Sequence, residues 1–360
     1  MKKKGCGFGA IVFGIILFIA CSIFLFQNEG RSVRRSRALD EIVNAVEVAG
    51  NDLGVPDGTL ILVAETAVGN EALVDHQFKV EAPEGSIKLV KDVEMYQWKE
   101  TKKTDDDKTT YTYEKIWSSS HIDSSGFDQI SGHENPSELI YESDTYAVSE
   151  VDLGAYHVRD LFISKMSGSQ SIGAIDESQL DQKMTVEGNT IFVDTSGSGT
   201  LTKPNIGDYK IVFTYTPSAE YTVLGKKSGT EITNYETKNG DLAEVEPGKL
   251  SKEALKEEKD NDNKMMTIAL RIGLTIGIIM ANMLTISPVT SLLGNVPLAG
   301  NLVNKGIGLV GGILGVSWSL LVIAAGWFVY RPIISIGLLV IIIVLIVLLF
   351  KSKDKKVEMA

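Results

Sequence analysis

Residues 7–26 read GFGAIVFGIILFIACSIFLF and contain no charged side chain. At about 1.5 Å of rise per residue, a helix of this length covers the roughly 30 Å hydrocarbon core of a bilayer. A cleaved signal peptide is the alternative, because Lys2 to Lys4 form a basic start and Ile19-Ala20-Cys21 weakly resembles a lipoprotein cleavage site. The apolar run continues past Cys21, so we predict a membrane-spanning helix over 7–26, after a short basic tail at 1–6.

Three further apolar segments follow near the end of the chain, and we predict spans over 265–286, 307–330 and 333–350. The last two form a hairpin joined by Arg331-Pro332, since a proline starts a new helix without losing a needed donor. Residues 287–306 are apolar but rich in Gly and Pro, which predicts a re-entrant or interfacial segment. The final stretch, 351–360, is a basic tail.

The charge is divided unevenly along the chain. The whole sequence has a net charge of −11, yet outside residues 28–264 there are ten basic and two acidic side chains, which leaves −19 for that central region. Nucleic acid is excluded as a partner, because binding to it gains from basic groups that displace counterions. The sequence predicts an α-helical membrane protein with four transmembrane helices, and a large β-rich α+β soluble domain at 27–264 inserted between helix 1 and helix 2.

Four spans place both chain ends on one side of the membrane. With the ends in the cytoplasm, that face carries eight basic residues near the spans and the other face six, which favours an extracytoplasmic or luminal domain. The domain has no cysteine and no Asn-x-Ser/Thr acceptor site, which favours a prokaryotic source. We therefore expect the bacterial plasma (inner) membrane, or the endoplasmic reticulum or inner nuclear membrane if the chain is eukaryotic.

Strands are expected to dominate the soluble domain after a short helix over 37–48. β-branched and alternating runs predict strands over 59–68, 145–151, 185–193, 209–216 and 221–224, and a long hairpin of 87–99 with 109–117. Residues 156–165 fit either a helix or a strand, and the charged stretch 250–263 predicts a solvated helix that leads back to the membrane.

Two features of the spans are candidates for function. Glycines at 308, 311, 312 and 315 form two small-xxx-small patterns that bring helices close, either within the chain or between copies of it. Arg271 is the one charged side chain inside a predicted span. It can serve an ion path or a lipid contact, but it lies about six residues from the start of the span, so its long side chain can also reach the headgroups.

The soluble domain offers little chemistry. No catalytic or cofactor-binding motif and no paired metal ligands occur, so we expect no catalytic residue, no metal site and no cofactor. A calcium site at Asp105 to Asp107 is the open exception. The most site-like stretch is 127–136, FDQISGHENP, in which His133 and a carboxylate form a possible acid–base pair. The alternative is a loop in which Asn and Asp side chains bond the backbone and Phe127 is the anchor.

Several stretches together resemble the LUMA family, also called transmembrane protein 43. They are spread in order along nearly the whole chain, and the arrangement of one span before the domain and three after it is similar too. The stretches are Asn28-Glu29-Gly30-Arg31, Val93 to Trp98, Phe127-Asp128 with Gly132-His133 and Asn135-Pro136-Ser137, Gly207 to Tyr215, and Ala325 to Pro332.

The resemblance implies a multipass protein that organises membrane protein complexes, partly by self-association, and the source considerations make a bacterial member the expected one. It brings no catalytic residues. The short tail before the first span and the stretch 165–205 depart from animal members, so their nuclear-envelope partners are not carried over.

The leading hypothesis is a membrane scaffold or organiser that is not an enzyme and whose partners are the lipid bilayer, other membrane proteins and further copies of the chain. An ion channel or a channel accessory subunit is the alternative, which depends on Arg271 and the segment 287–306. A membrane-surface enzyme that uses the 127–136 loop is a second alternative.

Overall fold

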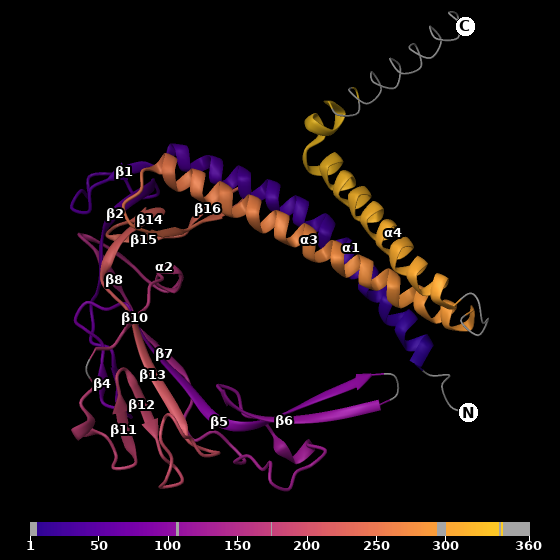
Figure 1. Cartoon of the computed structure of the whole chain (residues 1–360). Coiled ribbons are helices and arrows are strands. Elements are labelled where there is room, and N and C mark those ends of the chain that lie inside the picture. Colours follow the sequence, from indigo (N-terminus) through magenta and orange to yellow (C-terminus); the bar gives the residue numbers. More distant parts are fainter. Residues whose placement is uncertain (1–5, 106–107, 174, 294–299, 338–339, 341–360) are drawn as a thin grey trace, which may run out of the picture. The chain divides into compact units, whose positions relative to one another are not determined.

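The computed structural model describes residues 6–105, 108–173, 175–293, 300–337 and 340 (Figure 1). The chain divides into two compact units. The helical unit comprises Met1–Val43, Glu236–Asp241 and Glu253–Ala360, and the β unit comprises Asn44–Tyr235 and Leu242–Lys252. Each unit is built differently, so each is described by itself.

Three long helices make up the described part of the helical unit. They are α1 (Cys6–Leu39), α3 (Lys252–Leu293) and α4 (Gly300–Tyr330), of 34, 42 and 31 residues. Each contains a stretch long and apolar enough to cross a membrane. Residues 332–337 form a further helical stretch after Arg331. Most of the predicted fourth span, 333–350, lies outside the described residues, so three of the four predicted spans are found.

The helices are longer than the predicted spans. α1 continues through the polar residues 27–39, and the chain then forms a 3₁₀ helix (Asp40–Asn44) and strand β1 (Val46–Val48), so the predicted separate helix over 37–48 is wrong. α3 begins at Lys252, which agrees with the predicted helix over 250–263. α1 continues past the predicted span because its polar residues find partners on a neighbouring helix, as Asn28 does on α3.

The predicted re-entrant segment at 287–306 is also divided differently. Residues 287–293 belong to α3 and residues 300–306 to α4, while 294–299 lie outside the described residues. A continued helix satisfies the backbone donors and acceptors that an apolar environment leaves without water.

The first sheet of the β unit closes on itself through the pairing of β2 with β14. Its order is β1-β2-β8-β9-β15-β14-β18, and β14 also pairs with β2, so five of its strands form a ring. A closed ring removes the free edges on which strands of other chains could pair. The strands are β2 (Leu60–Gly69), β8 (Val151–Leu153), β9 (Tyr156–Val158), β14 (Ala219–Ser228), β15 (Glu231–Thr233) and β18 (Glu244–Pro247).

The second sheet is antiparallel and has the order β11-β12-β13-β5-β6, with β10 on β13 and β7 on β5. Its centre is β13 against β5, where Tyr209 lies opposite Met95. The strands are β5 (Lys88–Asp105), β6 (Lys108–Ser118), β7 (Asp144–Ala147), β10 (Gln170–Ser171), β11 (Met184–Glu187), β12 (Thr190–Val193) and β13 (Tyr209–Thr216). Short elements complete the chain: β3 (Val74–Asp75), β4 (Val80–Glu81), α2 (Leu161–Lys165), β16 (Tyr235–Thr237) and β17 (Gly240–Leu242).

One apolar core runs through both sheets. Phe78, Tyr209, Phe213 and Tyr221 are among its largest fully buried side chains, and alternate residues of β13 point into it. This alternation is the pattern from which the strands were predicted. The strand predictions over 59–68 and 209–216 and the long hairpin of β5 and β6 are confirmed.

Other strand predictions merged separate elements. The predicted strand over 185–193 is a hairpin of β11 and β12, which turns at Gly188, where the backbone has φ +66°. That left-handed conformation suits a residue without a Cβ. The predicted strand over 145–151 is split between β7 and β8, and the ambiguous stretch 156–165 holds both β9 and α2.

Candidate functional site

The four residues Asn28-Glu29-Gly30-Arg31 lie within α1, where other helices pack closely against it. Asn28 and Glu29 are buried, with Glu29 at 0% exposure. A Cβ on Gly30 would lie 2.6 Å from the ring of Tyr330, so a larger residue there would displace that ring of α4. This part of α1 is therefore a contact surface.

Glu29 pairs with Arg271 of α3. Arg271 Nε donates to Glu29 Oε1 over 2.7 Å, and its Nη2 donates to Oε2 over 2.6 Å. Such a two-bond pair combines charge attraction with a defined geometry. A buried carboxylate on the neighbouring helix therefore holds the Arg271 guanidinium, and the predicted reach of this side chain to the headgroups stays a prediction.

α4 completes the same site through Trp327. Its indole Nε1 donates to Glu29 Oε2 over 2.9 Å, and its ring lies 5.8 Å from the Arg271 guanidinium. A Cβ on Gly326 would lie 2.8 Å from the Glu29 side chain, so this glycine allows the close approach. We call Glu29, Arg271 and Trp327 the helix clamp, because each comes from a different helix.

A second set of polar contacts lies beside the clamp. Arg31 donates from Nη1 to Asn263 Oδ1 over 3.1 Å and from Nη2 to Thr267 Oγ1 over 2.9 Å. Asn28 donates to the Thr267 carbonyl over 3.2 Å, and Asn263 donates to the Ser32 carbonyl over 2.9 Å. These bonds tie α1 to α3 along about one turn of each helix.

The chemistry of this site is that of helix assembly. Glu29 accepts three hydrogen bonds, so it is a poor candidate for a general base, which needs a free lone pair facing a substrate. In lipid, helices associate through packing and polar contacts, since apolar surface gains nothing by leaving lipid tails. The clamp provides both kinds of contact.

In the β unit, Asn135 fastens the 127–136 loop to strand β5. Its Oδ1 accepts from the Trp98 backbone N–H over 2.7 Å, and its Nδ2 donates to the carbonyls of Trp98 and Ile122 over 2.8 and 3.0 Å. Its own backbone N–H donates to Ser124 Oγ. The Asn135 amide thus replaces a missing strand, as the structural interpretation of this loop predicted.

His133 packs among aromatic rings. It stacks on Tyr113 with 3.9 Å between ring centroids, stands edge-on to Trp98 at 4.6 Å, and its Nδ1 lies 3.0 Å from the Gln129 carbonyl. Phe127 also lies against Tyr113, at 6.1 Å. These contacts favour a structural ring over the acid–base pair that was the alternative.

The remaining loop residues serve its shape. The backbone N–H of Asp128 donates to Glu100, which also accepts from the Tyr113 hydroxyl. Gly132 has φ +86°, a conformation that favours glycine, and the Pro136 carbonyl lies 2.7 Å from the His121 ring. All six predicted loop residues therefore lie in one place, and they are held mainly by contacts with β5, β6 and residues 121–124.

The predicted glycines of α4 lie in different surroundings. A Cβ on Gly315 would meet Ile279 of α3 at 2.6 Å, and one on Gly311 would lie 3.5 Å from Met283, whereas nothing described lies within 4 Å of Gly312. Gly308 belongs to α4, but the surroundings of its position are not described. Gly311 and Gly315 pack within the chain, whereas the described residues leave space around a Cβ at Gly312.

A buried ion pair in the β unit was missed by sequence reasoning. Asp75 is fully buried and lies 3.0 Å from the Lys91 ammonium, while Tyr146 donates to the same Asp75 oxygen over 2.8 Å. Burial alone would raise the pKa of Asp75, but hydrogen bonds from the Phe78 N–H, Lys91 and Tyr146 outweigh it and lower the pKa. This pair anchors β3 to β5.

Metal ligands do not gather anywhere in the part of the chain that the structure describes. The alternative of a calcium site at Asp105 to Asp107 falls partly outside it.

Sequence reasoning also missed Glu29 and Trp327, although both lie in stretches that carried the family resemblance. The sequence did contain a signal for this pair. If the helix over 7–26 is extended without a break, Glu29 lies next to the membrane, and Arg271 needs an acidic partner there.

Comparisons with known proteins agree on one family. A family model described as Transmembrane protein 43 matches residues 95–332. Similar proteins include Transmembrane protein 43 of Homo sapiens and of Pongo abelii, each 27% identical over 348 residues, which covers 90% of this chain and 85% of the relative. The Transmembrane protein 43 homolog of Drosophila melanogaster is 28% identical over 262 residues, 67% of this chain and 66% of its own length. No solved structure matches. These relatives are animal proteins and do not bear out the expected bacterial source.

Proposed function

The chain belongs to the Transmembrane protein 43 family, a family of membrane proteins, and on that premise we propose that it is a multipass scaffold that assembles membrane protein complexes. The proposed role needs no catalytic residue and no cofactor. Its soluble domain would lie on the extracytoplasmic or luminal side of the membrane. Its spans would lie in the endoplasmic reticulum or inner nuclear membrane of a eukaryote, or in the plasma membrane of a bacterium.

The observation that carries the proposal is the way the 127–136 loop is built. Its polar groups are used to hold its own shape through Asn135 and His133. The loop nevertheless exposes the large apolar side chain of Ile130 at 44%, and Ile140, which follows the loop, is 59% exposed. A rigid loop that presents apolar side chains suits protein recognition, because little flexibility is lost when a partner binds.

Self-association is the second part of the proposal. Gly311 and Gly315 are occupied by α3, but the open face at Gly312 leaves room for a helix of another chain. The channel alternative has lost its main support, because Arg271 is engaged with Glu29 and Trp327 rather than left to line a path for ions.

Two measurements test the proposal on the full chain, one in mild detergent and one in intact membranes. In detergent, the mass of protein in each particle, without the bound detergent, should exceed that of one 39.1 kDa chain, and a strict monomer would contradict the self-association. A photo-crosslinking residue at Ile130 or Ile140 should join the protein to a membrane protein in intact membranes, and the same residue at the exposed control position Lys183 should not. Equal products at all three positions would contradict the loop's role.

An enzyme acting through the same loop makes a different prediction. Any turnover found with the purified protein should then disappear in His133→Ala, whereas the scaffold proposal expects none to depend on that ring. The orientation is tested separately by labelling a cysteine at the exposed position Thr104 in intact cells, with Cys6 and Cys21 replaced by serine. Labelling only after lysis would reverse the proposed orientation.

A further inference from the structure

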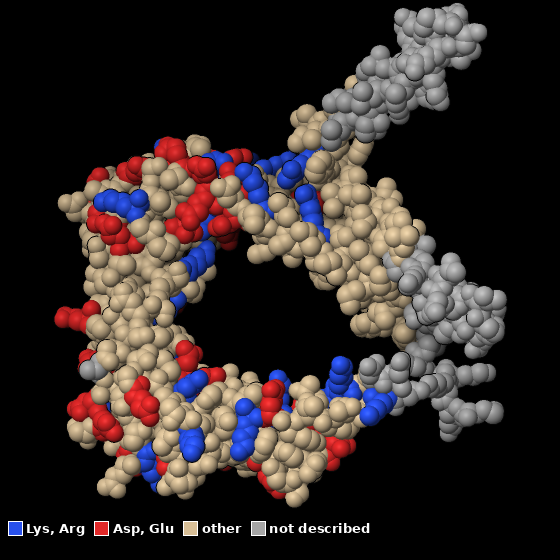
Figure 2. Space-filling model, viewed as in Figure 1, with Lys and Arg blue, Asp and Glu red and all other residues tan. Residues whose placement is uncertain are grey.

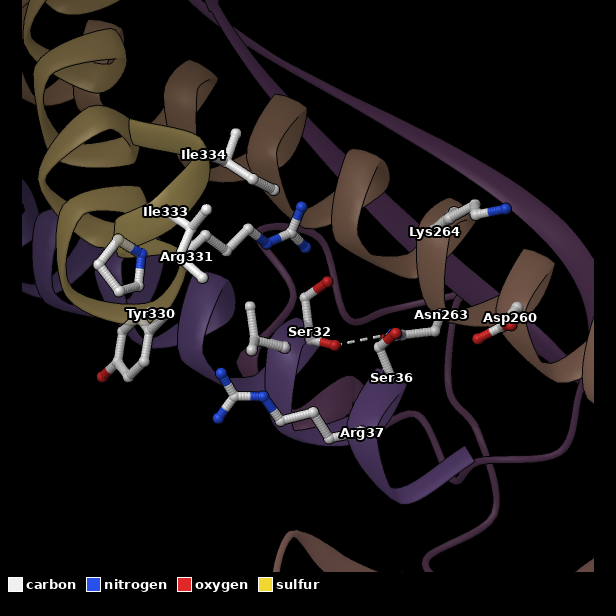
Figure 3. Close-up of a pocket in the computed structure, with 12 residues that line it drawn as sticks. Ser32, Ser36, Arg37, Asp260, Asn263, Lys264, Tyr330, Arg331, Ile333 and Ile334 are labelled. Atoms are coloured by element: carbon white, nitrogen blue, oxygen red, sulfur yellow. Dashed lines mark hydrogen bonds between the residues drawn. The ribbon is translucent and has the colours of Figure 1, made fainter. Parts of the chain in front are cut away.

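A pocket of about 600 Å³ opens in the helical unit next to the helix clamp (Figure 3). α1 contributes Val33 and Arg37 to its lining, α3 contributes Asp260 and Lys264, and the chain that leaves α4 contributes Arg331 and Ile333. The pocket is therefore built by all three described helices, and nothing in the scaffold proposal uses it.

The pocket has a basic side. Figure 3 shows the Arg331 side chain extending over Ser32 and the Arg37 guanidinium turned toward Tyr330, while Lys264 points away from both. Asp260 is the acidic residue of the lining, and its carboxylate pairs with Lys256 at 2.7 Å rather than with either arginine of the lining, although Lys256 also lies 3.1 Å from Asp40. Two guanidinium groups therefore remain to attract an anion, and guanidinium geometry suits phosphate oxygens.

The same pocket has an apolar side. Ile333 and Ile334 are 87% and 52% exposed, and Val33 adds further apolar surface. Figure 2 shows basic groups on the helical unit beside a long stretch without charged side chains. An anion alone would need only the basic side, whereas a phosphate that carries hydrocarbon chains matches both.

The pocket lies at the depth of a membrane interface. The uncharged run of α4 ends at Tyr330, directly before Arg331. Trp327 and Tyr330 precede it, and these two residue types are enriched where hydrocarbon meets headgroups. Trp327 also lies 6.0 Å from the Arg331 guanidinium, which holds that arginine beside the pocket.

We infer that this pocket binds the phosphate headgroup of an anionic phospholipid in the leaflet that meets the last turn of α4. Arg37 and Arg331 contact the phosphate, and the acyl chains lie along Ile333 and Ile334. The bound lipid becomes part of the junction that the helix clamp maintains.

Fluorescence quenching by brominated lipids tests the inference in the full chain reconstituted into vesicles. The chain has four tryptophans, and replacing Trp318 by phenylalanine leaves Trp327 as the reporter within the described membrane helices. Brominated phosphatidylglycerol should bind beside Trp327 about tenfold more tightly than brominated phosphatidylcholine, as expected for two basic groups near an anionic headgroup. Equal quenching by the two lipids would overturn the inference.

Variants separate the pocket from general charge effects. Arg37→Gln leaves the Trp327–Arg331 contact in place and should reduce the preference to about threefold, and Arg37→Gln/Arg331→Gln should abolish it. Arg37→Lys/Arg331→Lys should retain most of it. The control Lys183→Gln/Lys203→Gln removes the same charge from exposed positions of the β unit and should leave the preference intact. If Arg37→Gln keeps the full preference for phosphatidylglycerol over phosphatidylcholine, the assignment is wrong. This single variant provides the test if the double variant fails to fold.

A competitor identifies the source of the phosphate. Millimolar glycerol 3-phosphate, which has no acyl chains, should leave the preference for phosphatidylglycerol unchanged. If it displaces the brominated lipid, the pocket recognises phosphate alone and the lipid assignment is wrong.

Discussion

The two units of this protein each bury an ion pair, and the two pairs are built differently. Glu29 and Arg271 are separated by 242 residues, come from two helices, and are joined by Trp327 from a third. Asp75 and Lys91 lie close together in sequence, on β3 and β5, within the unit whose apolar core runs through both sheets. The first pair holds together helices that the apolar effect does not drive into contact in lipid. The second pair fixes β3 to β5 in a core that apolar burial already assembles.

This difference has a physical basis. In water, burial of apolar side chains drives sheets together, so the Asp75–Lys91 pair need not add net stability. Its hydrogen bonds have to offset the cost of removing the two charges from water. Between membrane helices the apolar driving force is absent, and specific contacts decide which helix faces which. A broken pair should therefore open the helical unit but only weaken the β unit.

The largest effect is expected when the helix clamp loses its carboxylate. Glu29→Ala leaves Arg271 without its partner, and breaking a buried pair in this way destabilises by about 3–5 kcal/mol. Cys21 reports the loss, because it is buried between α1 and α3 and should react with a thiol reagent at a lower temperature in the variant. The measurement uses Cys6→Ser as background. Glu29→Leu/Arg271→Leu, which removes both charges, should restore much of the protection, and an unchanged Glu29→Ala would show that the clamp is dispensable.

A smaller and pH-dependent effect is expected for the pair in the β unit. The pKa of Asp75 is lowered in the folded state from its ordinary value of 3.8, so its stabilising contribution is present above that value and is lost as the pH falls through the lowered folded-state pKa. Asp75→Asn should therefore lose stability at neutral pH, by roughly 3 kcal/mol, and depend less on acid. Tryptophan fluorescence of Trp98 and Trp117 during denaturant titration at several pH values provides the measurement. A variant whose acid dependence equals that of the unmodified chain would contradict the assignment.

The smallest effect is expected from packing beside the clamp. Gly326→Ala places a Cβ 2.8 Å from the Glu29 side chain and should destabilise the helical unit by about 1–3 kcal/mol, again measured through Cys21. Gly312→Ala is the matched control, because an added Cβ there meets no described atom within 4 Å. Equal shifts in the two variants would mean that the cost is not one of close approach to Glu29.

The sequence was sufficient for several parts of the fold. The apolar runs predicted the three described helices, and alternation predicted β2, β13 and the long hairpin. The structural interpretation of the 127–136 loop also agrees with its contacts, because Asn side chains that bond the backbone act over short distances in sequence.

The errors share a cause. A separate helix was predicted over 37–48 because polar residues follow the first span, yet those residues continue α1 and have partners on α3 that no local pattern displays. The strand over 185–193 was not divided, since a single glycine determined the turn. Glu29 was missed as the partner of Arg271 because the two residues lie 242 positions apart.

The membrane-spanning segments could be predicted from the sequence alone, because the free energy of transferring a segment into lipid is a sum over its own residues. The partner of each polar side chain on those helices could not, because it depends on how α1, α3 and α4 cross. That crossing follows from glycines that admit close approach and from charges that must be neutralised away from water, and both conditions are met only once distant segments have packed.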